Sequence, residues 1–448
     1  MLRLYLVLVR SKLDYGAHVY RTASPRALRI LDPIQNEGLR LATGAFRSSP
    51  ISSLHVESNV LPLDLHRESL AVKAFLRPYL LPSSPLRSLL VSEDLATSPW
   101  RFALLVYPRL VDAGLVDFNV LEFKFAGAPP WTFPPVRICL SLSKLVKASH
   151  SPSELRSSAL EHAQLHAPSV PVYTDGSKSG EGVGCAAVFP DFDVFVSLPV
   201  FASIFTAELC AIFLALSRIS FHNSANFVIY SDSRSALQAL GCLYTRNPLV
   251  LKIQRFLCDL HTRRKFVSFC WIPSHVGLSG NEKADVLAKR AIQLPPATHN
   301  ALPLQDYIPS IRRSIRASWQ SRWDQCVADG NKLAQLKPSL GPWSSCSQRC
   351  RRLEVSLSRL RIGHTRLTHG HLMAREAPPV CDRCRVRLSI SHILVECPTY
   401  SVPRNRFYPS LTSMPPRERL PFLLSESPTF SSSTLFAFLR VSGLMSDF

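Results

Sequence analysis

The chain has 448 residues, of which 46% are hydrophobic, so it is long enough for two or three domains with substantial cores. Lys and Arg outnumber Asp and Glu by 52 to 32, and the net charge of +20 favours a polyanionic partner, although a basic surface without a partner is the alternative. No apolar run reaches the roughly 18 residues that span a bilayer, so we expect no membrane segment. The leucine-rich start is interrupted by Arg3 and Arg10 and is interpreted as part of a core helix rather than a signal peptide.

The first third of the chain falls into two parts of different texture. Apolar residues recur at steps of three and four in residues 1–81, which predicts a helical region. Residues 82–170 are rich in Pro and Ser, with PPWTFPP at their centre, and are interpreted as a linker region with a few short elements.

Residues 171–294 change to strands and helices in alternation. Runs of β-branched and aromatic residues predict five strands, at 172–174, 182–189, 193–200, 227–231 and 265–272. Helical patterns predict four helices, at 205–219, 233–240, 248–263 and 281–292. Antiparallel strands followed by alternating strands and helices indicate an α/β fold with a mixed five-stranded sheet and flanking helices.

Residues 295–448 are predicted to form a helical, basic tail. Its first helix places Ile311, Ile315, Trp319 and Trp323 at four-residue steps, typical of a core stripe beside a solvated basic face. The chain has twelve cysteines, several of them inside apolar stretches, which indicates free thiols in a reducing, intracellular compartment, nucleus or cytoplasm.

Four carboxylates in residues 171–294 have positions that a structural role explains only in part. Asp175 follows a strand but could belong to an Asp-Gly turn, and Glu208 interrupts an apolar helix but could face solvent. Asp232 lies between a strand and a helix that it could cap. Asp285 is expected in the opening turn of the last helix, where an acidic residue suits the helix dipole.

Taken together, the four carboxylates favour a metal site. They lie at strand ends and helix starts of one predicted sheet, so they can converge on one edge of it. Clustered carboxylates repel one another unless cations neutralise them, and Mg²⁺ prefers oxygen ligands. Two such ions about 3.5–4 Å apart can clamp the attacking and leaving oxygens of a phosphodiester.

Four successive motifs carry a family resemblance: VYTDGS, TAELCAI, VIYSDSRSAL and WIPSHVGLSGNEKADVLA. In this order they resemble type 1 ribonuclease H, in the version carried by LINE-like (non-long-terminal-repeat) retrotransposons. The resemblance implies hydrolysis of the RNA strand of RNA/DNA hybrids with two Mg²⁺ or Mn²⁺ ions. It implies that Asp175, Glu208, Asp232 and Asp285 bind the ions and that His275 is an auxiliary catalytic residue that shuttles a proton or helps the product leave.

The regions on either side extend this resemblance. SKLDYGAHVY and LDPIQNEGLRLATGAFRSSP are similar to the segment that follows the polymerase palm in the same retrotransposons. No YxDD-like or FADD-like acidic pair occurs in the sequence, so we expect no polymerisation, a polymerase partner in trans, and a truncated element beginning at Met1.

Near the end of the chain, Cys381, Cys384, His392 and Cys397 have the spacing of a zinc knuckle. Three thiolates and one imidazole are ligands that suit Zn²⁺, although such a group also arises by chance. The alternative to a nuclease is a catalytically decayed protein that only binds nucleic acid, and the four intact carboxylates speak against decay.

Overall fold

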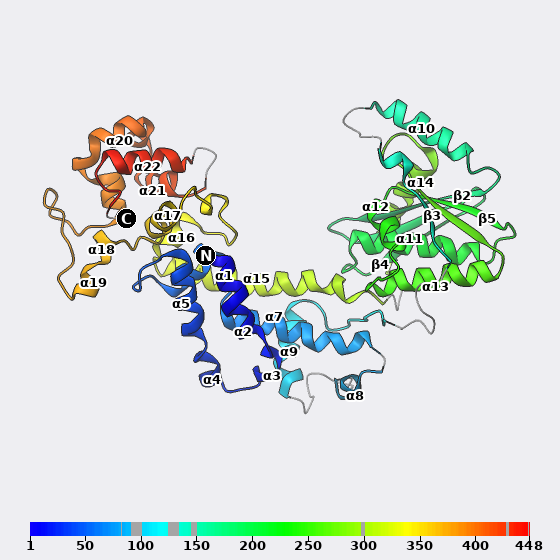
Figure 1. Ribbon diagram of the computed structural model, residues 1–448, viewed down its shortest axis with the longest axis horizontal. Helices are drawn as coiled ribbons and strands as arrows, with labels where there is room; N and C mark the ends of the chain where they lie inside the picture. Colours follow the sequence, from blue (N-terminus) through cyan, green and yellow to red (C-terminus); the bar gives the residue numbers. More distant parts are fainter. Residues whose placement is uncertain are drawn as a thin grey trace. The chain divides into compact units, whose positions relative to one another are not determined.

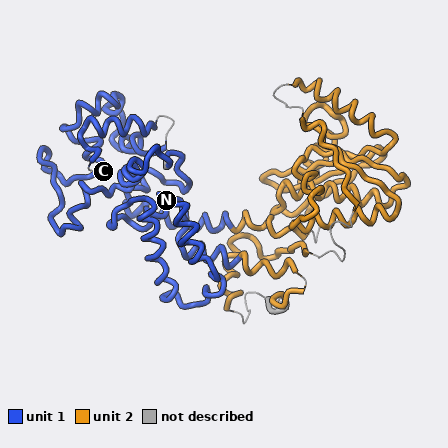
Figure 2. The backbone as a smooth tube through the Cα atoms, in the orientation of Figure 1, with its two compact units in different colours: residues 1–72, 312–448 blue, residues 73–311 orange. Residues whose placement is uncertain are grey.

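The computed structural model describes the chain except residues 82, 91–100, 124–133, 145–149, 297–300, 427–429 and 447. It divides into two compact units, shown in different colours in Figure 2. Unit 1 combines Met1–Val72 with Arg312–Phe448, and unit 2 is the continuous segment Lys73–Ile311.

Unit 2 is built on a six-stranded mixed sheet in the order β1-β6-β5-β2-β3-β4. In chain order the strands are β1 (Arg137–Cys139), β2 (Val170–Lys178), β3 (Val183–Val188), β4 (Asp193–Leu198), β5 (Asn226–Ser231) and β6 (Phe266–Trp271). β2, β3 and β4 form an antiparallel meander, whereas β5 pairs parallel with β2 and β6, and β6 pairs parallel with β1. The mixed sheet with flanking helices agrees with the ribonuclease H-like α/β fold predicted from the sequence.

Helices cover both faces of this sheet (Figure 1). Because side chains alternate along a strand, Phe227 and Ile229 of β5 pack on one face, against α11, α12 and α13, while Val228 and Tyr230 pack on the other, against α10. α14 packs on this second face, against Ala186 and Val188 of β3. These helices are α10 (Pro152–Gln164), α11 (Ile204–Ile219), α12 (Arg234–Leu240), α13 (Pro248–Thr262) and α14 (Ser279–Ala291).

All five predicted strands are present, and the sixth strand, β1, comes from the segment interpreted as a linker. That segment also contains two helices of 12 and 13 residues, α9 and α10. A capping box starts α10, because the Ser151 side chain accepts from the Glu154 N–H and Glu154 accepts from the Ser151 N–H. The remaining elements of unit 2 are η2 (Arg77–Leu80), α8 (Pro85–Leu90), α9 (Arg101–Asp112) and η4 (Ser141–Lys144).

Unit 1 is helical, as predicted for the N-terminal region. Its N-terminal segment contains α1 (Leu2–Leu4), η1 (Tyr5–Arg10), α2 (Ser11–Asp14), α3 (Ala17–Tyr20), α4 (Pro25–Arg29), α5 (Asp32–Thr43) and α6 (Ile51–Ser58). Its C-terminal segment contains α16 (Lys332–Leu336), η5 (Ser344–Cys346), α17 (Arg351–Ile362), α18 (Arg366–His369), α19 (His371–Ala374), η6 (His392–Glu396), η7 (Pro398–Tyr400), α20 (Ser401–Phe407), η8 (Pro409–Ser413), α21 (Pro416–Leu424) and α22 (Ser432–Val441). Two helices, α7 (Leu63–Leu76) and α15 (Leu304–Ala328), contribute residues to both units.

The two segments of unit 1 share partly buried polar contacts. The Ser53 hydroxyl donates to Asn331 Oδ1 at 3.1 Å, and the Arg359 Nε–H donates to the Gly44 carbonyl at 2.8 Å. Glu57 is buried, and although the Arg361 charge counteracts it, desolvation raises the pKa of this carboxyl. The N-terminal and C-terminal segments therefore form one compact unit, whereas the sequence pattern predicted residues 1–81 and 295–448 as separate regions.

The predicted stripe on α15 is buried, since Ile311 is 0% and Trp323 is 1% exposed. Arg312 and Arg313 lie exposed beside it, as expected for a solvated basic face. Across the described residues, the structure contains no helix with the length and hydropathy needed to cross a bilayer.

Candidate functional site

Strand pairing brings two of the predicted carboxylates together at the centre of the sheet. Thr174 of β2 pairs with Ser231 of β5, so the next residues, Asp175 and Asp232, lie side by side where β5 ends. Asp175 is not in a hairpin turn, because β2 continues to Lys178 and Asp175 pairs with Ala186 of β3. The N-cap residue of α12 is Ser233 rather than Asp232, and the Ser233 side chain makes no capping bond.

Helix α11 adds Glu208 from its first two turns. The helix approaches β2 so closely that a Cβ atom on Gly176 would lie 2.6 Å from the backbone nitrogen of Glu208. The Asp-Gly pair therefore serves close packing of a helix on a strand rather than a turn. Glu208 is 7% exposed, so the alternative that this side chain faces solvent is wrong.

Asp175, Glu208 and Asp232 form one compact group of carboxylates. Each offers one oxygen, and the three oxygens all lie within 4.8 Å of one another. Asp175 is 6% exposed, and the buried Glu208 Oε2 atom has no hydrogen-bond partner among the described residues. A buried carboxylate oxygen without a donor is costly, so this pattern suits a cation as the missing partner.

The electrostatics of the group point the same way. Burial and the negative charges of Asp232 and Asp285 raise the pKa of Asp175 to about 7. Burial, Asp175 and Asp232 raise the pKa of Glu208 well above its ordinary value. The backbone N–H of Gly176 lowers the pKa of both carboxyls but does not outweigh burial and repulsion.

Asp285 lies beside this compact group rather than within it. It is in the second turn of α14, which begins at Ser279, so the expected place in the opening turn is wrong. Its Oδ2 atom accepts a hydrogen bond from Lys289 Nζ at 2.7 Å, an i,i+4 ion pair. Asp285 and Lys289 are both close enough to shift the pKa of Asp175, in opposite directions.

His275 is exposed on the loop between β6 and α14. Its φ of 56° and the φ of 82° at Gly277 indicate a tight loop, and His tolerates such a conformation better than most residues. The Gly277 N–H donates to Glu282 Oε1 at 2.9 Å, which holds the loop to the start of α14.

Lys289 and Glu282 were not identified as site residues from the sequence. The signal for Lys289 was available, because a basic residue four positions after Asp285 lies on the same helix face. Glu282 was noticed as part of a motif, but its contact with the Gly277 backbone depends on the loop conformation.

The oxygen-rich chemistry of the compact group fits a hard divalent cation. Mg²⁺ and Mn²⁺ bind carboxylate oxygens, and a metal ion offsets the repulsion among three close carboxylates. The orphaned Glu208 oxygen offers a position for such an ion, while Asp285 is held at the margin by Lys289.

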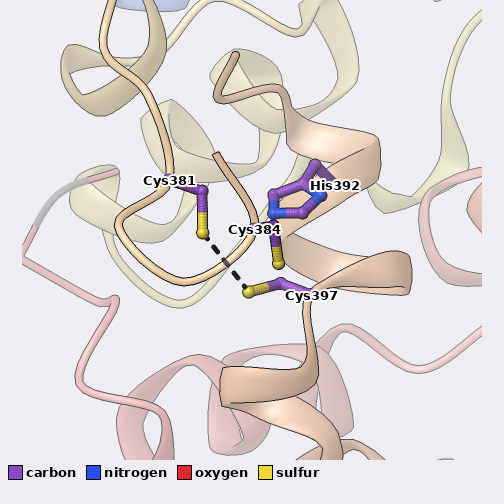
Figure 3. A group of neighbouring side chains, drawn as sticks. All are labelled: Cys381, Cys384, His392 and Cys397. Carbon is purple, nitrogen blue, oxygen red and sulfur yellow. Dashed lines mark hydrogen bonds between the residues drawn. The ribbon is translucent and has the colours of Figure 1, made fainter. Parts of the chain in front are cut away.

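The second predicted metal site is in unit 1. The Sγ atoms of Cys381, Cys384 and Cys397 and a ring nitrogen of His392 all lie within 4.8 Å of one another. Figure 3 shows the three sulfur atoms gathered beside the imidazole ring, with the Cys381 and Cys397 sulfurs 3.8 Å apart. The backbone N–H of Cys384 and the side chain of His392 lower the pKa of the Cys381 thiol to about 6, whereas desolvation and the neighbouring thiols raise the pKa of Cys384 to about 11.

The donors of this group fit zinc. The buried His392 Nε2 atom has no hydrogen-bond partner in the described part of the chain, while Nδ1 lies 3.6 Å from Glu396 Oε2. A carboxylate behind one ring nitrogen is the usual support for a histidine that binds metal through the other. His392 and Cys397 stand next to a hydrophobic core that contains Ile393 and Leu394, whereas most of residues 376–388 are exposed.

Three other histidines of the tail keep no assigned metal role. The rings of His364 and His369 stack with their centroids 3.7 Å apart, and the centroid of the His371 ring lies 6.2 Å from that of His369. Burial lowers the pKa of His364 to about 4 and that of His369 to about 3, so both rings are neutral at pH 7.

Residues 167–293 match the RNase H family model, so this segment of unit 2 is similar to an RNase H domain. The matched segment contains β2 to β6 together with all four carboxylates and His275. No curated protein is similar enough to the chain to count as a relative. The match supports nuclease activity on RNA/DNA hybrids in general, and with it binding of nucleic acid.

Proposed function

We propose that this protein hydrolyses the RNA strand of RNA/DNA hybrids at the carboxylate group of unit 2, with two Mg²⁺ or Mn²⁺ ions. The observation that supports this most is that Asp175, Glu208 and Asp232 converge within 4.8 Å inside the segment that matches the RNase H model. When bound, the ions supply Lewis-acid stabilisation of the attacking and leaving oxygens of the phosphodiester.

The protein's own groups divide the remaining work. Asp175, Glu208 and Asp232 hold the ions and, because β2, β5 and α11 fix them, do so without rearrangement. Asp285 supplies a fourth carboxylate at the margin, where Lys289 orients it. Recognition of the 2′-OH distinguishes the RNA strand from DNA.

His275 acts as the auxiliary catalytic residue in this proposal. Its exposed position on the loop before α14 lets the ring reach a bound strand, and the loop is anchored at Gly277 by Glu282. The imidazole moves a proton to the leaving oxygen or helps the cleaved strand depart.

We further propose a retrotransposon origin, on the motif resemblance to the LINE-like version of the enzyme. The regions flanking the RNase H domain would then be a remnant of the part that follows a polymerase palm and a tail with a zinc knuckle. In that setting a polymerase acting in trans makes the hybrid that this domain cuts.

One Zn²⁺ ion in the tail completes the proposal. Cys381, Cys384, His392 and Cys397 would bind it, supported by their mutual approach within 4.8 Å and by the orphaned His392 nitrogen. The knuckle then contributes to nucleic-acid binding rather than to hydrolysis, since zinc is not part of the carboxylate group.

The test is cleavage of an end-labelled RNA/DNA hybrid by the full chain with Mg²⁺, compared with RNA and DNA duplexes of the same sequence. We expect cleavage of the hybrid RNA strand alone, lost in Asp175→Asn and retained in Asp191→Asn, a matched change of an exposed aspartate in the same domain. Equal cleavage by Asp175→Asn would remove this group from the active site. Hybrid binding without any cleavage would favour the alternative of a decayed nucleic-acid-binding protein.

A further inference from the structure

A second group of thiol and imidazole side chains lies in unit 2, on the sheet face covered by α10. The parallel pairing of β1 with β6 puts Cys139 directly opposite Cys270. Paired residues on neighbouring strands point their side chains to the same face, so the two thiols are neighbours. Cys270 is fully buried, and Cys139 is partly exposed.

Helix α10 brings a histidine to these thiols. Leu155 and Ala159 are its buried residues, and His162 follows at the next step of the same face. His166 continues that face, and its ring stacks on His162 with centroids 5.1 Å apart. The helix therefore presents His162 to the sheet at the position where β1 and β6 pair.

The contacts around His162 are close on both sides of its ring. Nε2 lies 3.1 Å from Cys139 Sγ and 2.7 Å from the Ser141 hydroxyl, and Nδ1 lies 3.8 Å from Cys270 Sγ. One ligand atom each from Cys139, His162 and Cys270 lies within 4.8 Å of the other two.

Hydrogen bonding alone satisfies this arrangement poorly. Two groups approach Nε2, yet one ring nitrogen carries either one proton or one lone pair and can serve only one of them well. A thiol is also a weak donor and a weak acceptor, so a buried thiol beside an imidazole gains little from the contact. A cation that takes a sulfur from each cysteine and a nitrogen from the histidine accounts for all three residues.

We propose that Cys139, His162 and Cys270 bind a Zn²⁺ ion in unit 2. Zn–S bonds of about 2.3 Å and Zn–N bonds of about 2.0–2.1 Å place tetrahedral ligands roughly 3.6–3.8 Å apart. The ion binds one ring nitrogen of His162, and the three ligand atoms, which already lie within 4.8 Å of one another, reach this spacing by small movements of the side chains. The Ser141 hydroxyl, 3.2 Å from Cys139 Sγ, stands next to the fourth position, which it or a water molecule fills. The ligand set of two sulfurs and one nitrogen selects zinc over Mg²⁺.

The ion would join three elements that are distant in the sequence. Cys139 and His162 precede the segment that matches the RNase H model, whereas Cys270 lies on a strand within it. Zinc therefore fastens β1 and α10 to the edge of the RNase H sheet. The site is independent of the carboxylate group, so its failure would leave the proposed hydrolysis untouched.

The test is the zinc content of the full chain, purified with a thiol reductant and measured by elemental analysis. The double variant Cys384→Ala/Cys397→Ala serves as the parent, because two of the four tail ligands are then gone and the tail site does not contribute. We expect one zinc per chain in this parent, none after adding Cys139→Ser, and none after adding His162→Asn. Adding Cys185→Ala, which removes a fully buried thiol from β3, should leave one zinc.

Two further measurements separate metal binding from loss of fold. Substituting Co²⁺ for zinc in the parent should give a thiolate-to-metal charge-transfer absorption that Cys139→Ser abolishes, while circular dichroism shows both chains folded. Zinc that persists in Cys139→Ser and His162→Asn would overturn the proposal. So would a parent without zinc, or peptide mapping that finds a Cys139–Cys270 disulfide in the reduced preparation.

Discussion

The carboxylate group of unit 2 and the Cys381–Cys397 group of unit 1 collect metal-binding side chains in opposite ways. Strand register and the close approach of α11 fix the carboxylates, and a hydrophobic core packs on the same elements. The cysteines at 381 and 384 instead lie on a mostly exposed loop, tied to the core only on the side of His392 and Cys397. The fold alone brings the carboxylates together, whereas we propose that a bound zinc ion holds the exposed part of the second group in place.

The two units also differ in their titratable groups with shifted pKa values. Unit 2 buries carboxyls whose pKa is raised, as at Asp175, to about 7. Unit 1 buries a carboxyl of this kind too, Glu57, but it also contains imidazoles whose pKa burial lowers, as at His55 and His364, to about 4. Protonating these imidazoles therefore lowers the free energy of unfolding of unit 1 at acid pH, whereas ionising Asp175 lowers that of the metal-free unit 2 as the pH rises.

Glu208→Gln and Asp232→Asn should have the largest effects. Each removes a charge that holds a metal, and losing about 4 kcal/mol of transition-state stabilisation corresponds to roughly a 10³-fold slower reaction. We expect the thermal unfolding midpoint of the metal-free chain to stay the same or rise, because one source of repulsion is gone. Single-turnover cleavage of the labelled hybrid and a thermal melt measure the two quantities.

If the Glu208→Gln chain were unfolded, the fold would depend on this carboxylate, and the contrast between the two groups would be wrong. Near-wild-type cleavage by either variant would remove that residue from the site.

Cys384→Ala should have the next largest effect, at the tail. Loss of a ligand should weaken zinc binding by at least about 10²-fold, because even a supporting residue is worth about 10–100-fold. Amide hydrogen exchange should then accelerate in residues 376–388 and stay unchanged in β2 and β5. Cys350→Ala, a change at an exposed cysteine of the same unit, is the matched control. Unchanged exchange in that loop would show that the knuckle folds without metal.

His275→Ala should slow cleavage about tenfold, less than the full contribution of a general acid–base group. The physical reason is that the ring moves a proton without holding a metal, so the site still assembles. His261→Ala, at an exposed histidine on α13 of the same domain, is the control. If His275→Ala reduced the cleavage rate as much as Asp232→Asn does, the auxiliary role of His275 would be wrong.

The last effect we expect is an acid sensitivity of unit 1. The pKa values of His55, His364 and His369 are lowered to about 4, 4 and 3, so the unfolded chain binds protons below pH 6.5 that the folded chain refuses. The free energy of unfolding of unit 1 therefore falls as the pH drops from about 6.5 to 4. Each proton that the folded unit excludes lowers this free energy by about 1.4 kcal/mol per pH unit, and a lower unfolding midpoint at acid pH reports the change.

Hydrogen exchange followed across a pH series resolves the two units. The metal-free unit 2 should respond in the other direction, because the raised pKa of Asp175 makes its unfolding free energy fall as the pH rises from about 4 to 7. Substituting His364→Gln should reduce the slope of unit 1 alone. Parallel pH responses in both units would contradict this contrast.

The sequence predicted the RNase H sheet well because its signals are local. Runs of β-branched and aromatic residues mark the long strands, and Asp232 lies where a strand ends and a helix begins. The Asp175-Gly176 pair left a turn open as an alternative, because the packing of α11 on Gly176 is a contact between elements about 30 residues apart. Asp285 was placed one turn too early because the start of α14 was set at Asn281 instead of Ser279.

Other features could not be predicted because they depend on pairs far apart in the chain. The contact of Ser53 with Asn331 bridges 278 residues, and no pattern near either residue indicates it. The three-residue strand β1 is too short for a periodic signal and follows a Pro-rich stretch. The start of α10 was different: Ser151 and Glu154 form a capping box that was present in the sequence and went unused.

The parallel pairing of β1 with β6 has a consequence for any attempt to isolate the RNase H domain. β1 is only three residues long, and short edge strands resist edge-to-edge association. A fragment that begins at Val172 loses both β1 and α10, which leaves one edge of β6 unpaired and uncovers Tyr230 and Ile272. Such an edge is a template for intermolecular strand pairing, so this fragment should aggregate. A fragment that begins at Pro134 retains β1 and α10, which cover the edge, and should associate less.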